Sequence, residues 1–405
     1  MAILMMRADM RGPAMPRQAG VTLIELMVGV TIGLIVMLAI TSAVSTMNLQ
    51  RRTTVSGNDA KENGQNAIAL LDRAARAAGN GLFYNGQLLC TTLNAYYNGS
   101  VVSDGAPFAP VKISDGGTSG SDKITFVYAE AARGSSISHI VDNMPNPSSN
   151  FVVNNKGALA EGDLALIGVP GSGRPCTLFQ VSALVPGGGN CNGITTDCVK
   201  IQHNPGGSTP YNPSNPDHAF SDSPKYGYEK TGTTAGPAVV SRIGALHHDT
   251  YEVLCNSLVS HDASKAPGCT SSPLAFTDAI PWVANVVMLQ AQYGISDKAD
   301  SDVVTSWQNA SGPTWSAPAA ADVPRIKAIR VAVVSRSVEP GGSQVSAPCT
   351  NAAGVANNGP CSFQDADSPV IDLSNVPVAP GKTWRHYRYR VYHSVIPLRN
   401  VLWNY

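Results

Sequence analysis

One carboxylate near the N-terminus, Glu25, stands at a position that could carry chemistry. It precedes Leu26–Gln50, a run of 25 residues without a charged side chain, long enough as a helix to cross a hydrocarbon core of roughly 30 Å. A lone ionised side chain in a membrane helix costs about 2.5 to 3.5 kcal/mol and normally marks a function with a partner. Cleavage after Gly20 would give Val21 a positive α-amino group, which on a neighbouring subunit could neutralise this carboxylate.

The cysteines are the second set of residues with defined chemistry. They all follow the apolar segment: Cys90, Cys176, Cys191, Cys198, Cys255, Cys269, Cys349 and Cys361. Outside a membrane they would meet an oxidising compartment, where an even number indicates disulfides, although eight cysteines allow 105 pairings. Short loops favour Cys191 with Cys198, Cys255 with Cys269 and Cys349 with Cys361, which leaves Cys90 with Cys176. A zinc site is the alternative, but no CxxC pair supports it.

Two polar clusters could bind a metal ion. Asp297, Asp300 and Asp302 could offer oxygens to calcium, but their spacing is not that of an EF-hand loop, so we expect a solvated acidic turn. His247-His248-Asp249 could ligate a metal or act in acid–base chemistry. Adjacent residues on a strand point to opposite faces, and no second ligand cluster accompanies them, so we expect an exposed turn or strand end. No cofactor is predicted.

Two further segments resemble ligand-binding motifs superficially. Residues 168–173 lack the Gly-Lys-Ser/Thr ending of a phosphate loop and predict a β-turn. Residues 382–392 interleave basic and aromatic side chains, as a groove for single-stranded nucleic acid does. They also alternate as a half-buried strand does, with Tyr387, Tyr389, Val391 and Val395 on one face and His386, Arg388 and Arg390 on the other. We therefore expect a strand rather than contact with nucleic acid. No catalytic motif is recognisable, so the chain is not predicted to be an enzyme.

Composition agrees with an exported chain. Charged residues make up 14% of the 405 residues, whereas glycine and proline are abundant, at 38 and 28; a typical protein has about 25% charged residues. Loss of residues 1–20 removes three arginines and one aspartate, which leaves a net charge of about −2. Nothing in this balance indicates bulk attraction to nucleic acid or anionic lipid.

The element that must position Glu25 is a long helix. Apolar residues recur at three- and four-residue steps from Ala67 to Ala78, which predicts that the helix continues beyond the membrane and ends at Gly79-Asn80-Gly81. No proline interrupts residues 21–78, so any bend would come from local melting at Gly57 or Gly64. Gly29 and Gly33 form a GxxxG pair, which is either a close-packing face or a pair of tolerated glycines.

Beyond residue 81 the sequence predicts strands joined by long turn-rich loops. The expected strands are 123–129, 150–153, 163–169, 177–185, 238–243, 250–254, 283–295, 326–335 and 384–396. The longest loops are 204–237, 309–324 and 340–380, and the third contains Cys349 and Cys361, which suits a stapled loop. The absence of an internal repeat favours one elaborated ectodomain.

The N-terminal segment resembles a known leader. Gly20 followed by Val-Thr-Leu-Ile-Glu-Leu is similar to the class III leader of type IV pilins and type II secretion pseudopilins. The resemblance implies cleavage after Gly20 by a prepilin peptidase, N-methylation of Val21, and docking of Glu25 to the next subunit of a fibre. Because such leaders are short, Met15 is the expected natural start. An ordinary secretory signal cut near Ala43, or a plain membrane anchor, would need neither the cut after Gly20 nor the carboxylate.

The last third resembles the PilW minor pilins of type IVa pili, over residues 282–294, 326–337 and 389–400. The resemblance implies a type IV pilin-like α+β fold with a predominantly antiparallel ectodomain and disulfide-stapled loops. The expected segments are a leader at 1–20, a transmembrane helix at 21–48, its amphipathic continuation at 49–81, and a β-rich extracytoplasmic domain at 82–405.

The resemblance to PilW minor pilins also implies a function. The resemblance implies a subunit that primes pilus assembly in a tip complex with other minor pilins, the major pilin and a large tip adhesin. It would begin as a single-pass protein of the inner membrane, with its C-terminal domain in the periplasm, and end at the pilus tip. The alternatives are a J-like pseudopilin of type II secretion, which is generally a much shorter protein, and a membrane-tethered surface adhesin or enzyme.

Overall fold

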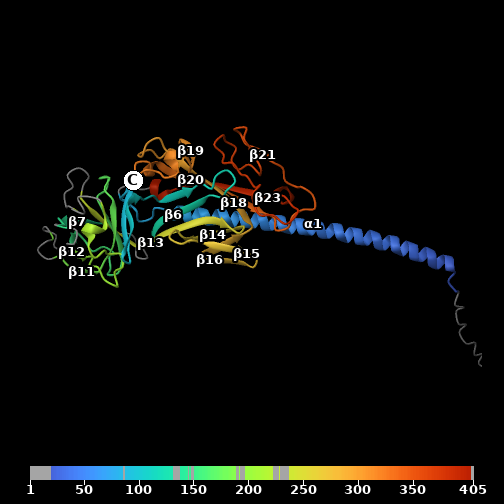
Figure 1. The fold of residues 1–405 in the computed structure, drawn as a ribbon, viewed down its shortest axis with the longest axis horizontal. Coiled ribbons are helices and arrows are strands. Elements are labelled where there is room, and N and C mark those ends of the chain that lie inside the picture. Colours follow the sequence, from blue (N-terminus) through green and yellow to red (C-terminus); the bar gives the residue numbers. More distant parts are fainter. Residues whose placement is uncertain are drawn as a thin grey trace, which may run out of the picture. The chain divides into compact units, whose positions relative to one another are not determined.

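The computed structural model describes residues 20–84, 87–130, 137–144, 146, 150–187, 191, 197–221, 228 and 237–402. The chain divides into two compact units, residues 1–55 and 56–405, and each is described by itself. The division falls within one long helix, α1 (Leu23–Ala77, 55 residues), which Figure 1 shows in blue. Of the expected leader, residues 1–20, only Gly20 is described; residues 1–19 lie outside the described residues.

The first unit contains the apolar part of α1. Residues Leu23–Asn48 are long and apolar enough to cross a membrane, and none of this stretch is buried within the structure. Threonine hydroxyls inside it return to the helix backbone: Thr31 Oγ1 donates to Val28 O at 2.9 Å, and Thr41 Oγ1 donates to Met37 O at 2.8 Å. These bonds satisfy polar groups that would otherwise be costly in an apolar environment.

In the second unit, α1 buries a row of residues that are small except for Leu71. Ala60, Gly64, Ala67, Leu71 and Ala75 recur at four- and three-residue steps and are all buried, as an amphipathic helix against a core requires. The same apolar cluster takes side chains from strands β5, β6, β13, β14, β17, β18, β20 and β23. The predicted continuation of the helix and its end before Gly79 are thus present, and Gly79 takes the left-handed conformation that ends helices, with φ +79°.

The larger sheet is mostly antiparallel. Its strand order is β11-β12-β8-β7-β13-β9-β10-β3-β4, with β6, β5, β14 and β17 added from β13, and β10–β3 is a parallel pair. The strands are β3 (Thr92–Tyr97), β4 (Ser100–Pro107), β5 (Val111–Ser114), β6 (Lys123–Glu130), β7 (Ile137–Asp142), β8 (Phe151–Val153), β9 (Leu164–Gly168), β10 (Cys176–Gln180), β11 (Ala183–Pro186), β12 (Val199–Gln202), β13 (Val239–Leu254), β14 (Ser257–Asp262) and β17 (Ile280–Ala284).

A second sheet, of order β19-β18-β20-β23, packs on the same core. Its strands are antiparallel: β18 (Val286–Ile295), β19 (Ser306–Asn309), β20 (Ile326–Arg336) and β23 (Tyr389–Pro397). Figure 1 shows β14, β18 and β23 beside the second half of α1. The minor elements are β1 (Phe83–Tyr84), β2 (Gln87–Leu88), α2 (Pro216–Ala219), β15 (Gly268–Ser271), β16 (Leu274–Thr277), α3 (Gly312–Trp315), η2 (Val323–Arg325), β21 (Cys349–Thr350), β22 (Ala356–Asn357), η3 (Trp384–His386) and α4 (Arg399–Leu402).

Several predicted strand boundaries are wrong for identifiable reasons. The strands expected at 238–243 and 250–254 are the single strand β13, because a bulge between Arg242 and Gly244 lets the chain continue. The strand expected at 283–295 is divided by Asn285, which has φ +59°. The strand expected from Trp384 starts at Tyr389, because Trp384–His386 forms a short 3-10 helix.

Candidate functional site

Glu25 closes a capping box at the start of α1. Its Oε2 accepts hydrogen bonds from the Thr22 backbone N–H at 3.0 Å and from Thr22 Oγ1 at 2.9 Å. In return, the Glu25 N–H donates to Thr22 Oγ1 at 3.3 Å. This reciprocal arrangement satisfies backbone donors that the first helical turn leaves open, and it places a negative charge at the positive end of the helix.

Both of these bonds to the carboxylate use Oε2. Among the described residues, Oε1 has no hydrogen-bond partner. Val21 lies just before the helix and is 72% exposed, so both the first residue after the expected cleavage point and the carboxylate are open to another molecule. The arrangement can therefore accept a further donor from outside the chain.

Gly29 and Gly33, the glycine pair on the apolar part of α1, are also free of contacts with the other described residues. A β-carbon built at Gly29 or Gly33 would have no atom within 4 Å, so neither glycine packs against the rest of the described chain. No contact among the described residues explains why these two positions lack a side chain. A close-packing role for Gly29 and Gly33 against another helix stays a prediction.

The second half of α1 is held by contacts that sequence analysis missed. A β-carbon at Gly64 would overlap the ring of Tyr392 on β23, so helix and strand approach as closely as a glycine allows. Next to it, Ser335 Oγ on β20 donates to the Ala60 carbonyl at 2.6 Å. Gly64 thus serves packing and not local melting, and α1 is helical through it. Its place in the row of small residues was the signal available in the sequence.

The end of α1 is capped from the far end of the chain. Asn400 Nδ2 lies 3.2 Å from Arg76 O, 3.5 Å from Ala77 O and 2.9 Å from Ala78 O. These are carbonyls that the last helical turn leaves without an intrahelical partner. Asn400 thereby joins the C-terminal segment to the helix, and no local sequence signal connects residues more than 320 positions apart.

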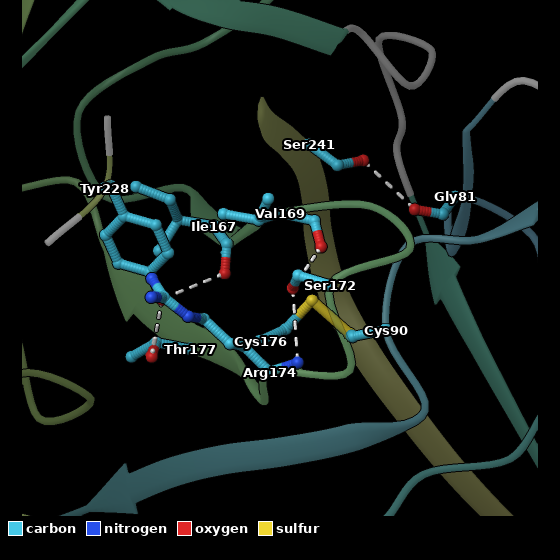
Figure 2. The surroundings of a disulfide bond; sticks show 10 residues. All are labelled: Gly81, Cys90, Ile167, Val169, Ser172, Arg174, Cys176, Thr177, Tyr228 and Ser241. Carbon is cyan, nitrogen blue, oxygen red and sulfur yellow. Dashed lines mark hydrogen bonds between the residues drawn. A yellow bond between two sulfur atoms is a disulfide. The ribbon is translucent and has the colours of Figure 1, made fainter. Parts of the chain in front are cut away.

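The cysteines are joined in the pairing that loop lengths favour. The bonds are Cys90–Cys176, Cys191–Cys198, Cys255–Cys269 and Cys349–Cys361. Figure 2 shows Cys90–Cys176, which joins the start of the ectodomain to β10. The same view contains the turn after β9, where Ser172 Oγ donates to Val169 O at 2.7 Å and accepts from Arg174 N at 3.2 Å. Residues 168–173 are therefore a self-bonded turn and not an open phosphate loop.

Two buried arginines on β20 fasten the long loop of residues 337–388. Arg330 is 1% exposed and lies between the rings of Trp307 and Phe363, at 4.9 and 4.4 Å from their centroids. Its Nη1 is 2.5 Å from Asp365 Oδ2. Arg336 lies over the Tyr387 ring at 4.4 Å and donates to a loop carbonyl. Stacked, hydrogen-bonded guanidinium groups hold the loop in addition to the Cys349–Cys361 bond.

A lysine pairs with one carboxylate of the acidic turn. Lys327 Nζ donates to Ala299 O at 2.8 Å and lies 3.7 Å from Asp302 Oδ1, while Asp297 Oδ1 accepts from Thr305 Oγ1 at 2.7 Å. Burial lowers the pKa of Lys327, but the nearby Asp302 and Asp300 charges oppose this shift. Across the described residues no group of three His, Cys, Asp or Glu side chains could hold a metal ion. Asp297, Asp300 and Asp302 are thus not gathered into such a group.

The histidine pair lies inside a strand, so the expected exposed turn or strand end is wrong. His247 and His248 are in the middle of β13, opposite Tyr128 and Val127 of β6. His247 stacks on Tyr128 at 4.9 Å and pairs with Glu130 at 2.7 Å. Burial lowers the pKa of His248, and the nearby Asp262 and Asp249 charges oppose this shift. The two rings point to opposite faces, as a strand requires, and His247 serves cross-strand pairing.

Among the basic and aromatic residues near the C-terminus, those from Tyr389 onward lie on strand β23, while Trp384–His386 form the 3-10 helix before it. Tyr387 is buried, Tyr389 and Val391 are partly buried, and Arg388 and Arg390 are exposed. Val395, predicted to share the buried face, is 53% exposed. Val395 lies opposite Arg330 in the sheet, on the edge strand β23. The loop of residues 337–388 covers the Arg330 side chain but leaves Val395 exposed to solvent. The aromatic rings are thus used in packing and do not form an open platform for bases.

Comparison with protein families finds two matches. Residues 15–41 match the prokaryotic N-terminal methylation motif, and residues 258–400 match type IV pilus-assembly protein W, PilW. Searches of curated proteins and of solved structures find no match. The first match contains Gly20, Val21 and Glu25, and the second ends at Asn400.

These matches agree with the geometry at both ends of the molecule. The methylation motif covers the capped, exposed start of α1, and the PilW match covers β18, β20, β23 and the Asn400 cap, which contact its second half. The predicted α+β pilin-like fold, with an apolar N-terminal helix, a mostly antiparallel ectodomain and disulfides, is confirmed. The chain carries the methylation motif of prokaryotic pilins and a PilW region, and these two matches support a type IV pilus-related minor pilin.

Proposed function

We propose that this protein primes type IV pilus assembly as part of a tip complex with other minor pilins, the major pilin and a large adhesin. A prepilin peptidase removes residues 1–20, and Val21 becomes the methylated N-terminus. The protein starts in the inner membrane with residues 82–405 in the periplasm, and assembly carries it to the pilus tip. It acts as a structural subunit and not as an enzyme.

The observation that carries this proposal is the start of α1. Glu25 lies within the matched methylation motif and precedes an apolar stretch whose side chains are exposed throughout. Such a surface is stable only in lipid or against other apolar helices. A fibre core built from neighbouring helices would supply those contacts, and a neighbour's N-terminal amine would supply the counter-charge for Glu25.

The capping box indicates which carboxylate oxygen of Glu25 would pair with the amine. Thr22 holds Glu25 Oε2 at the helix start, while Oε1 has no partner among the described residues. A positive amine that binds Oε1 would give the second carboxylate oxygen a hydrogen-bond donor and would leave the Thr22 bonds to Oε2 intact. In a low-dielectric helix core, close pairing and full hydrogen bonding are what offset the desolvation of two charges.

The contacts around the second half of α1 support a mechanical role for the ectodomain. Tyr392 packs against Gly64 and Asn400 caps Ala78 O at 2.9 Å, so the strands are fixed to the helix at two levels. The position of the helix in the fibre would then set the position of the ectodomain at the tip.

The proposal is tested by replacing the acid in the full-length protein. Glu25→Ala and Glu25→Gln should leave leader removal and protein level unchanged but should prevent copurification with other pilins and reduce piliation. Glu62→Ala is the matched control, because Glu62 is an exposed acid on the same helix outside the apolar stretch. Normal copurification and normal piliation of both Glu25 variants would contradict the proposal. Copurification of the natural chain with secretion pseudopilins instead would assign it to type II secretion.

A further inference from the structure

Positive charge is concentrated in the last part of the chain, although the chain as a whole is neutral. Residues 373–405 contain no Asp or Glu, and they contain five cationic side chains: Lys382, Arg385, Arg388, Arg390 and Arg399. Two of these, Arg388 just before β23 and Arg390 within it, are exposed. Among the described residues neither of the two side chains makes a hydrogen bond or an ion pair. Their charge is therefore not neutralised within the described chain.

The contacts of β23 with α1 place these two arginines at one end of the second unit. Arg390 is opposite Ser335 in the sheet, and Ser335 Oγ donates to Ala60 O at 2.6 Å. Beyond the other end of β23, Asn400 Nδ2 lies 2.9 Å from Ala78 O. The strand thus runs beside α1 in the same direction, and the arginines lie where α1 first joins the ectodomain core.

The length of the chain keeps this end of the ectodomain close to any membrane that contains the apolar stretch. That stretch ends at Asn48, and the twelve residues 49–60 are helical, which at the helical rise corresponds to about 18 Å. The headgroup layer occupies about 5 to 8 Å of this length. Arg388 comes two extended residues before Arg390, so it lies about 7 Å further towards the membrane. The distance that remains, about 5 Å, is shorter than the Debye length of about 8 Å at physiological ionic strength.

We propose that Arg388 and Arg390 bind the headgroups of anionic phospholipids in the membrane that holds the apolar half of α1. This inference rests on the part of the proposed function that starts the protein in the inner membrane. Guanidinium groups pair with phosphate through two parallel hydrogen bonds. An acidic protein would also attract these arginines, but the apolar stretch brings lipid, and not a particular protein, to this end of the ectodomain. The contacts would hold the ectodomain against the bilayer until the subunit enters a fibre.

The test uses the full-length protein in lipid nanodiscs that each hold one copy. Two probe lipids are compared, phosphatidylglycerol and phosphatidylcholine, each with a photoreactive group beside its phosphate. The phosphatidylglycerol probe should label residues 385–390, as located by mass spectrometry, and the phosphatidylcholine probe should not. Labelling should also fall as the salt concentration rises, because screening shortens the reach of the charges. Equal labelling by the two probes, or labelling by neither, would overturn the proposal.

Substitution of the arginines provides the second readout. A cation near an anionic surface strengthens binding about fivefold, so Arg388→Gln combined with Arg390→Gln should reduce labelling by phosphatidylglycerol roughly 25-fold. Lys112→Gln is the matched control, because Lys112 is an exposed cation on β5. It lies two residues after Pro110, which is beside Gly79 at the other end of α1. The control should be labelled as strongly as the natural chain, and a double variant labelled equally strongly would contradict the lipid contact.

The same variants separate this inference from the proposed function. In cells, the arginine double variant should still copurify with other pilins, because Glu25 is unchanged. Loss of a pilin partner together with unchanged lipid labelling would assign the arginines to a protein surface and overturn the lipid proposal. A natural chain that copurifies with pilins but is not labelled would sink the lipid contact and leave the proposed function intact. A natural chain that is labelled but recovers no pilin would overturn the proposed function alone.

Discussion

Gly64 of α1 lies against the ring of Tyr392, so closely that the helix position admits no side chain. This contact joins the helix to the last strand of the chain, although more than 320 residues separate them in sequence. Together with the Ser335 bond to Ala60 O at 2.6 Å, it makes the second half of α1 part of the ectodomain core. A pilin-type helix is thereby anchored by the same region that matches PilW.

Gly64→Ala should therefore destabilise the protein. Alanine favours a helix by up to about 1 kcal/mol over glycine, but overpacking a tight contact costs about 1 to 3 kcal/mol, and the clash with Tyr392 should decide the sign. Gly57→Ala is the control, because a β-carbon there meets nothing within 4 Å; it should be neutral or slightly stabilising. Urea unfolding of the full-length protein in detergent measures both. Equal effects at the two glycines would show that the contact does not matter.

The cap at the other end of α1 gives a second prediction. Asn400→Ala removes the donor to Ala78 O and should lower the free energy of unfolding by about 1 kcal/mol. Asn400→Asp should be worse, because it brings a negative charge to the negative end of the helix. Asn58→Ala, on the exposed face of α1, should have no effect. If Asn400→Asp proved as stable as the natural protein, the capping role would be wrong.

These contacts mark the limit of what the sequence predicts. The helix, its end before Gly79, the β character of the ectodomain and the disulfide pairing favoured by short loops all follow from local periodicity, turn residues and spacing. Gly64, Tyr392 and Asn400 depend on which distant segments meet, and no local pattern encodes that. Local patterns predict two strands, 238–243 and 250–254, where the structure has one. The residues between them, which include the polar His247, His248 and Asp249, resemble a loop in sequence but pair with β6.

Arg330 should be required for the order of the loop at residues 337–388. Arg330→Lys keeps the charge but loses the planar stack between Trp307 and Phe363 and one charged hydrogen bond, so the free energy of unfolding should fall by about 2 kcal/mol. Limited proteolysis should then cut within the loop. Arg388→Lys is the control, because Arg388 is exposed. An unchanged cleavage pattern in Arg330→Lys would mean that the Cys349–Cys361 bond alone holds the loop.

A buried acid predicts a pH dependence. Asp122 accepts backbone bonds from Gly116 N at 2.9 Å and Ala291 N at 2.7 Å, yet burial raises its pKa from 3.8 to about 7. The folded state therefore holds a proton that the unfolded state releases, so the contribution of Asp122 to stability is greatest below about pH 4 and is lost as pH rises to about 7.

The measurement is the free energy of unfolding from about pH 4 to about pH 9, compared between the natural protein and Asp122→Asn. The difference between the two should change with pH by on the order of 4 kcal/mol over this range, and it should level off above pH 7. Asp59→Asn, an exposed acid on α1, should show no such change. A constant difference between Asp122→Asn and the natural protein across the range would contradict the assignment.

The pairing of Glu25 with a neighbour's N-terminus is tested most directly by zero-length carboxylate–amine coupling in the assembled complex, followed by mass spectrometry of the N-terminal peptides. We predict that the chain begins at methylated Val21 and that Glu25 is coupled to the terminal amine of a different subunit, with the product lost in Glu25→Gln. A retained leader, or a Glu25 that never couples to another chain in a complex that has formed, would contradict the account.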